Sequence, residues 1–185
     1  MFDKFFLLSS PLLKIMQQFT FRSFKLRLRH RRKIFRSFLN RIEKNPPAKL
    51  DIISERVDKE VWKEVDCLSC ANCCKTMTPT YTVKDIKKIS AHLDMPVTEF
   101  KNKWLRKEKG TGDWINKSLP CQFLDNKTNM CGIYEVRPAD CAGFPHLPKK
   151  KMVEYIHVHK QNIDSCPATF KMVEKMMLLL HKHKG

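Results

Sequence analysis

Eight cysteines are the residues best able to do chemistry in this chain of 185 residues. Four of them lie within eight positions, in the segment CLSCANCC, and the other four follow at wider intervals. In order, the cysteines are Cys67, Cys70, Cys73, Cys74, Cys121, Cys131, Cys141 and Cys166. Thiolates bind soft metal ions, and two thiolates separated by two residues reach one ion from a single turn of chain. The dense spacing therefore indicates metal binding rather than isolated buried thiols.

The alternative use of eight cysteines is a set of disulfides, and the compartment decides between the two. The segment 1–16, MFDKFFLLSSPLLKIM, has an apolar run that Ser-Ser-Pro interrupts, and no small-residue cleavage site follows it. It makes a poor secretory signal. No apolar run reaches the ~18 residues of a transmembrane segment. We therefore expect a cytoplasmic protein whose thiols are reduced and bind metal.

The grouping of the first cysteines depends on the local backbone. Cys67, Cys70 and Cys73 have the spacing of a ferredoxin-type run, and Cys166, which precedes a proline, is suited to be the remote fourth ligand. In a helix, however, Cys67, Cys70 and Cys74 would share one face. In a loop, Cys73 would complete the first set instead. Both alternatives remain open from the sequence.

The later cysteines are spaced ten residues apart, at Cys121, Cys131 and Cys141. A short hairpin over 121–134 would place the first two opposite each other, and the proline-bounded loop 137–145 could return the third. Eight thiols suffice for two four-ligand sites; the alternative is one site, with the remaining cysteines structural or reactive. The expected metal is zinc or iron, and a 4Fe-4S cluster is the other form that iron could take.

Three histidines could add ligands, but each is better explained as an ordinary residue. They are His146, His157 and His159. The last two alternate with apolar residues in MVEYIHVH (152–159), a pattern that predicts a strand with these histidines facing solvent.

Basic charge is concentrated near the N-terminus. The net charge is +17, and residues 1–50 hold 13 Lys and Arg against two acidic residues. Within 21–42 the apolar residues recur at helical spacing, which predicts an amphipathic helix with a basic outer face. Its partner would be RNA or an acidic membrane surface; the alternative is a helix packed on its own domain. Prolines at 46–47 divide the chain into a basic segment and linker (1–50) and a cysteine-cluster domain (51–185).

The remaining pattern predicts an α+β fold, in which helices surround the short hairpin and metal stabilises a small core. Further helices are expected over 51–65, from Thr82, from Thr98 and from Pro167. Thr82 begins a capping box, and proline suits the first helical position.

The linked motifs resemble a known family. CLSCANCC, PCQFLD (120–125), CGIYEVRPADCAGFP (131–145) and the final Cys-Pro are similar to the CxxCxxCC family of zinc- or iron-chelating domains, the YkgJ-like cysteine-cluster proteins. The resemblance covers about residues 64–170. It implies that all eight cysteines are metal ligands or their close neighbours, with Arg137, Pro138 and Phe144 in the surrounding framework. A flagellin lysine methylase, thought to use an iron–sulfur centre, is a distant relative, and its activity does not carry over to these residues.

Three classes of function fit these observations. We favour a metal-binding protein with a structural or chelating role. The second class is an iron–sulfur enzyme or electron carrier that acts on protein side chains. The third is a nucleic-acid- or ribosome-associated metal protein that uses the basic N-terminal helix. The sequence names no substrate, and it predicts neither the presence nor the absence of enzymatic activity.

Overall fold

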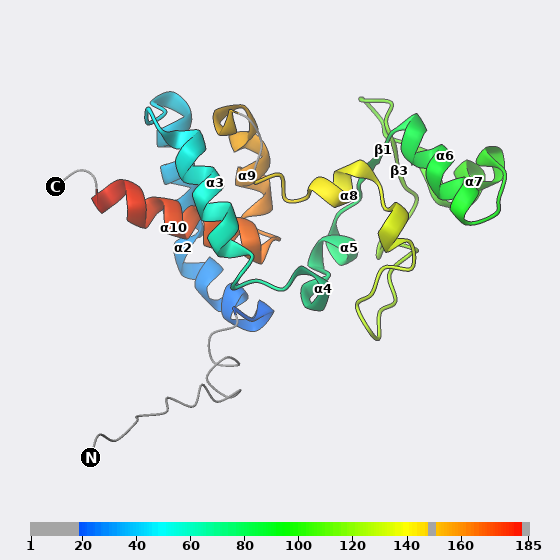
Figure 1. Ribbon diagram of the computed structural model, residues 1–185, viewed down its shortest axis with the longest axis horizontal. Helices are drawn as coiled ribbons and strands as arrows, with labels where there is room; N and C mark the ends of the chain where they lie inside the picture. Colours follow the sequence, from blue (N-terminus) through cyan, green and yellow to red (C-terminus); the bar gives the residue numbers. More distant parts are fainter. Residues whose placement is uncertain (1–18, 148–150, 183–185) are drawn as a thin grey trace, which may run out of the picture.

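A helical bundle forms the first of two hydrophobic cores in the computed structural model, which describes residues 19–147 and 151–182 (Figure 1). Its helices are α2 (Phe21–Lys44), α3 (Leu50–Val61), α9 (Ile156–Asn162) and α10 (Pro167–Lys182). Helix α10 packs against both α2 and α3, and α2 also packs against α9. The two ends of the sequence therefore build one bundle. The segment 1–16, considered above as a secretory signal, lies outside the described residues.

Helix α2 confirms the amphipathic helix that the sequence predicts. Thr20 caps it by accepting a hydrogen bond from the backbone N–H of Ser23 at 3.2 Å. Its apolar stripe is buried, and the ring centroids of Phe24 and Phe35 lie 5.5 Å and 4.8 Å from that of Phe170 on α10. Such ring pairs add about 0.5–1.5 kcal/mol each beyond the area they bury. The apolar face of α2 thus packs on the rest of the chain, which was the alternative considered above. Whether residues 51–185 fold without it stays a prediction.

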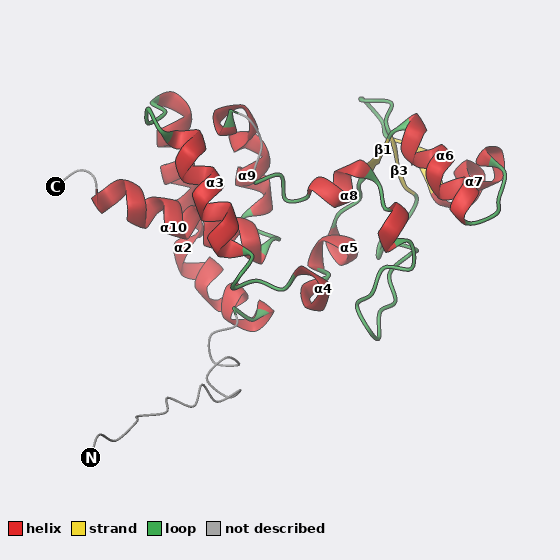
Figure 2. Cartoon of the chain, viewed as in Figure 1, coloured by secondary structure: helices red, strands yellow, loops and turns green. Residues whose placement is uncertain are grey.

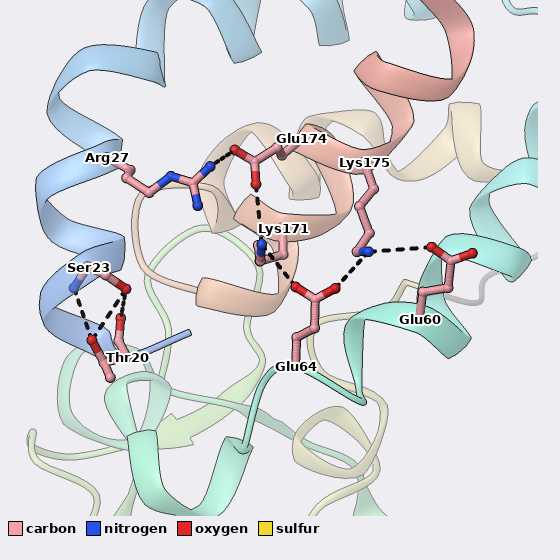
Figure 3. Close-up of polar contacts among 8 residues, drawn as sticks. All are labelled: Thr20, Ser23, Arg27, Glu60, Glu64, Lys171, Glu174 and Lys175. Atoms are coloured by element: carbon pink, nitrogen blue, oxygen red, sulfur yellow. Dashed lines mark hydrogen bonds and ion pairs between the residues drawn. The ribbon is translucent and has the colours of Figure 1, made fainter. Parts of the chain in front are cut away.

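Ion pairs reinforce the bundle around α10 (Figure 3). Arg27 on α2 pairs with Glu174. Glu64, just beyond α3, accepts from Lys175 at 2.7 Å and from Lys171 at 2.9 Å. Burial alone would raise the pKa of Glu64, but the hydrogen bonds from these two lysines outweigh it and lower the pKa. The network joins α2 and the end of α3 to the same face of α10.

The second core lies under a pair of helices and a small sheet. Helix α6 (Val83–His92) begins with the predicted capping box, in which Thr82 and Asp85 exchange side-chain-to-backbone hydrogen bonds of 3.0 Å. Helix α7 (Val97–Trp104) begins one residue before the predicted cap, Thr98. The strands are β1 (Thr80–Tyr81), β2 (Leu105–Lys107) and β3 (Trp114–Asn116), antiparallel in the order β1-β3-β2. Ile115 of the central strand pairs with Thr80 on one side and Arg106 on the other.

The described part of the chain also contains five short elements. They are α4 (Cys67–Cys70), α5 (Asn72–Thr76), the 3-10 helices η1 (Tyr134–Val136) and η2 (Met152–Tyr155), and α8 (Ala139–Gly143). Of these, α4, α5 and α8 lie between the bundle and the second core in Figure 1, whereas η2 packs in the bundle and η1 packs on α6. Figure 2 shows a mostly helical chain with one small sheet, so the α+β prediction is confirmed. Among the described helices, none has both the length and the apolar character needed to cross a membrane.

Two local predictions need correction. The stretch 152–159 is not a strand: it forms η2 and the start of α9, because Met152, Ile156 and His159 are buried on one helical face in the bundle. The hairpin over 121–134 is reduced to a single antiparallel bridge between Leu124 and Cys131, closed by a hydrogen bond from Gly132 N–H to the carbonyl oxygen of Phe123. The turn forms as predicted, but the segments on either side of it pair at only one position and are not strands.

Candidate metal centre

The segment CLSCANCC folds as two short helical turns with a reversal between them. Asp66 caps the first turn by accepting from the Leu68 N–H at 3.0 Å. Ala71 then takes a left-handed conformation, with φ of 44°, between α4 and α5. The segment is therefore neither the single helix nor the loop considered above. A left-handed alanine is costly by about 1–2 kcal/mol, and here it redirects the chain between Cys70 and Cys73.

Hydrogen bonds hold distant segments against this motif. Asn72 donates its side-chain amide to the carbonyl of Ser165 at 2.7 Å, which fixes the residue before Cys166. The N–H of Cys121 donates to the carbonyl of Cys74 at 2.8 Å. Asn129, in the turn of the reduced hairpin, accepts from Lys75 at 2.6 Å and donates to the carbonyl of Ser69 at 3.0 Å. These contacts bring cysteines almost a hundred residues apart into one region.

Four of the cysteines line one cavity, together with Phe144 and Pro145. They are Cys67, Cys70, Cys73 and Cys166, and we call them the first thiol group. The cavity holds about 20 Å³, room for a single water-sized group. Cys166 is buried, whereas Cys67 is exposed. The predicted ferredoxin-type run and its remote fourth cysteine thus do meet in space.

The other four cysteines gather on the side of the second core. We call Cys74, Cys121, Cys131 and Cys141 the second thiol group. Burial is the main cause of the raised pKa values of Cys121, Cys131 and Cys141, and charge on Cys74 adds to all three, as it also does at Cys67 and Cys70. Charge on Cys121, Cys131 and Cys141 adds to the rise in the pKa of Tyr81, which is mainly due to burial. Such effects require short separations. Cys141 is carried there by α8, and Cys131 by the reduced hairpin.

Cys73 and Cys74 stand where the two groups meet. Their sulfur atoms lie 3.9 Å apart. The hydrogen bond between them, donated by the Cys73 thiol, lowers the pKa of Cys74 and raises that of Cys73. Cys74 therefore loses its proton before Cys73. Cys73 lines the cavity of the first thiol group, whereas Cys74 does not line it and lies within electrostatic reach of cysteines in both groups.

Backbone amides prepare several sulfurs to be thiolates. Burial raises the pKa of Cys70, Cys121 and Cys131, but each sulfur accepts a hydrogen bond from the N–H two residues farther along. Cys166 likewise accepts from the N–H groups at the start of α10. An N–H donor stabilises the charged form of its acceptor. The repeated N–H donors therefore favour the thiolate form, which is the form that binds metal.

Nearby cations act in the same direction, as the two positive residues beside the cysteines in the sequence suggest. Lys75 favours the thiolates of Cys70 and Cys74, and Arg137 favours that of Cys131. Burial of the sulfur nevertheless outweighs these donors and cations at Cys70, Cys121, Cys131 and Cys166, whose pKa values are all raised. At Cys67, an exposed residue whose sulfur faces the cavity, loss of solvation raises the pKa to about 11. Protons must therefore leave when metal binds.

The donor set suits zinc or iron, since all eight cysteines are free thiols and thiolates are preferred ligands of both metals. As the side chains stand, no three Cys, His, Asp or Glu groups of residues 19–147 and 151–182 converge closely enough to hold an ion. Ligation therefore requires the sulfurs of a group to close in around the metal. All eight cysteines as ligands stays a prediction.

The histidines do not join either group. His146 lies 3.1 Å from Asp140 through its Nε2 atom, and His157 is exposed. His159 is fully buried in the bundle rather than facing solvent as predicted. The sequence analysis also missed Asp66, Asn72 and Asn129 as positioning residues. Asparagine and aspartate next to helical turns are the available signal, because their side chains bind nearby backbone groups.

Comparison with known proteins agrees with this arrangement of cysteines. The sequence profile of the CxxCxxCC family, described as a proposed zinc- or iron-chelating domain, matches residues 66–167, more than half of the chain. The chain belongs to the CxxCxxCC family. The matched region begins at the cap of α4 and ends at the first residue of α10, so it contains both thiol groups and leaves out most of the bundle.

The curated relatives of this CxxCxxCC protein add little about function. An uncharacterized protein of Methanocaldococcus jannaschii is 38% identical over 81 residues. The match covers 43% of this chain and 43% of the relative, so the chain spans less than half of that protein's length. No solved structure matches the chain.

Proposed function

We propose that the protein binds two metal ions, zinc or iron, one in each thiol group, in a structural or chelating role. The observation that supports this proposal is that Cys67, Cys70, Cys73 and Cys166 line one cavity, which leaves the other four of the eight free thiols for a second site. Four thiolates complete the coordination of a closed structural site. The family description supports metal binding in general, and the two-site division extends it.

The roles of the ligating residues follow from their surroundings. In the first thiol group, Cys67 and Cys70 come from α4 and Cys166 from the start of α10, so closing this group ties the centre of the molecule to the bundle. In the second group, Cys121, Cys131 and Cys141 tie the hairpin and α8 to Cys74. A bound ion supplies the cross-link, and its binding free energy adds to the free energy of folding. The thiols supply charge by losing protons, which the backbone N–H donors favour.

The size of the cavity favours single ions over a 4Fe-4S cluster in the first thiol group. A volume of about 20 Å³ accommodates one atom-sized guest. A cluster with four iron and four sulfide atoms would need the surrounding side chains to move apart, and here they must close in.

One observation favours a second candidate function, an iron–sulfur electron carrier or enzyme. Cys67 is exposed and borders an open depression of about 360 Å³ lined by Trp62, Glu64 and Asp66, among others. A redox centre in the first thiol group would have an edge accessible to a partner. Modification of protein side chains, the activity of the methylase that the motifs distantly resemble, belongs to this candidate.

Metal analysis of the anaerobically purified full-length protein tests the proposal. We expect two metal ions per chain and no cluster absorption. Cys166→Ala should lose one ion and keep the other, Cys141→Ala should do the same, and the double variant should lose both. A single ion that disappears in both single variants would show one shared site. A brown protein with several iron and sulfide ions per chain would establish the second candidate instead.

A further inference from the structure

The outer face of α2 carries a continuous band of positive charge. The helix has 24 residues and so extends for about 36 Å. At 3.6 residues per turn, its buried residues Phe24, Phe35 and Ile42 lie on one side, and six exposed cations lie on the other. These cations, which we call the basic face, are Arg22, Lys25, Arg29, Lys33, Arg41 and Lys44.

The basic face has no ion-pair partner in the described part of the fold, although Lys25 lies over the ring of Phe21 and Arg41 over that of the buried Phe38. Other cations of α2 are committed to the bundle: Arg27 pairs with Glu174, and Arg32 and Arg36 both pair with Asp164, at 2.7 Å and 2.8 Å. Within the described ranges, by contrast, no ion pair joins any residue of the basic face to a carboxylate. Charges of one sign repel one another along a helix. A partner that carries negative charge would relieve this repulsion.

Two exposed aliphatic side chains distinguish an anionic lipid surface from RNA as the partner of this face. Leu26 and Ile34 are 54% and 51% exposed. At 3.6 residues per turn, Leu26 lies among the cations of the basic face and Ile34 lies at its edge, beside Arg41. Proteins bind RNA through cations, which contact phosphates, and through aromatic rings, which stack on bases. Aliphatic side chains at these positions would have no apolar surface of RNA to contact. A lipid surface offers both: its headgroups attract the cations, and its acyl boundary receives the aliphatic side chains. In composition, the sequence before α2 is also rich in Phe and Leu, with Asp3 as its single acidic residue.

We propose that the basic face of α2 docks on a membrane surface of negatively charged phospholipid. The helix lies in the plane of the interface, with Leu26 and Ile34 inserted between headgroups. Its opposite face keeps its contacts in the bundle, so docking requires no unfolding. The proposal is independent of metal binding, because neither thiol group includes a residue of α2.

Binding of the full-length protein to vesicles tests the docking surface. The probe is a phosphatidylcholine vesicle in which about a third of the lipid is phosphatidylserine, with pure phosphatidylcholine as the neutral comparison. We expect flotation with the anionic vesicles only, and release at about 0.5 M salt. The triple variant Arg22→Gln, Arg29→Gln, Lys33→Gln should bind about 100-fold more weakly, since each cation near such a surface contributes about a factor of five.

A matched variant controls for net charge. Lys84→Gln, Lys87→Gln, Arg106→Gln removes the same three charges from exposed positions in the second core. It should bind the anionic vesicles about as well as the natural protein, because charges far from the surface are screened. An equal loss in both triple variants would mean that net charge alone drives the association, and the docking surface would be wrong.

The aliphatic pair separates lipid from RNA. Leu26→Gln, Ile34→Gln keeps every charge and should weaken vesicle binding about 30-fold, since each half-exposed side chain gains about a factor of five on full burial. Binding of a single-stranded RNA should not change in this variant. The proposal fails if the pair binds vesicles like the natural protein, if the natural protein ignores the vesicles, or if it binds RNA more tightly than anionic lipid. Circular dichroism checks that each variant remains folded.

Discussion

The buried imidazole of His159 should make the bundle sensitive to acid. The side chain is fully buried on α9, and neither ring nitrogen has a hydrogen-bond partner among the described residues. Burial, with smaller effects from the positive charge of His146 and His157, lowers its pKa from 6.5 to about 4. The neutral form is therefore the one that the fold accepts. Below pH 6.5 the unfolded chain takes up this proton while the folded chain does not.

The size of the effect follows from the two pKa values. Stability is fully present above about pH 6.5 and is lost progressively down to about pH 4. Each pKa unit corresponds to about 1.4 kcal/mol, so His159 alone should cost about 3 kcal/mol across this range. In His159→Phe, a ring of similar size without titrating nitrogens fills the same space, and this part of the acid sensitivity should disappear.

Urea unfolding of the metal-loaded protein at pH 7 and at about pH 4.5 measures the difference. Protonation of metal-bound thiolates also destabilises the protein in acid, but it acts equally on both proteins, so only the gap between their pH profiles reports on His159. His92→Gln, at an exposed position on α6, controls for loss of a histidine and should keep the natural profile. Parallel profiles for His159→Phe and the natural protein would refute the reasoning.

Three other substitutions test the fold around the candidate site. Ala71→Gly should raise the free energy of unfolding by about 1 kcal/mol, because glycine accepts the left-handed conformation without strain; a lower melting temperature would contradict this. Phe170→Ala should cost about 3–5 kcal/mol in urea unfolding, since the ring is fully buried among the aromatic residues of α2. A change below 1 kcal/mol would show that the bundle core repacks. Glu64→Gln should lower the melting temperature at pH 7 but not near pH 3. The pKa of Glu64 is lower in the folded protein than in the unfolded chain, so its charge stabilises the fold at a pH above the unfolded pKa, and this stabilisation is lost on acidification. An equal effect at both pH values would exclude the ion pairs with Lys171 and Lys175 as its cause.

Local signals in the sequence predicted much of the fold. The capping box at Thr82 and the proline at the first position of α10 both begin helices, because they satisfy or remove N–H groups at a helix start. The apolar stripe of α2 predicted Phe24 and Phe35 as core residues, but it also included Phe21, which is 37% exposed. At 3.6 residues per turn, Phe21 lies about 60° round the helix from Phe24, away from the centre of the buried face.

The sequence could not reveal features that depend on tertiary contacts. The strand predicted over 152–159 failed because α2 and α10 bury one helical face of this stretch, and alternation over eight residues does not distinguish the two patterns. The position of Cys73 in the cavity with Cys67 and Cys70 follows a left-handed turn at Ala71, a residue type that gives no sign of such a turn in the sequence. The spacing of the cysteines predicted them as candidate ligands. Which cysteines lie near one another could be learned only from the structure.

Helix α10 completes the bundle, and this affects the order in which the chain folds during translation. Helix α10 supplies Phe170 to the core of α2, and Cys166 immediately precedes it. At ribosomal speeds the 99 residues from Cys67 to Cys166 take roughly 5–20 s to add. During that interval α2 and α3 lack their packing partner, and the first thiol group lacks its fourth sulfur. The bundle core and the first thiol group thus wait for the same short stretch of chain, so the nascent protein gains both together.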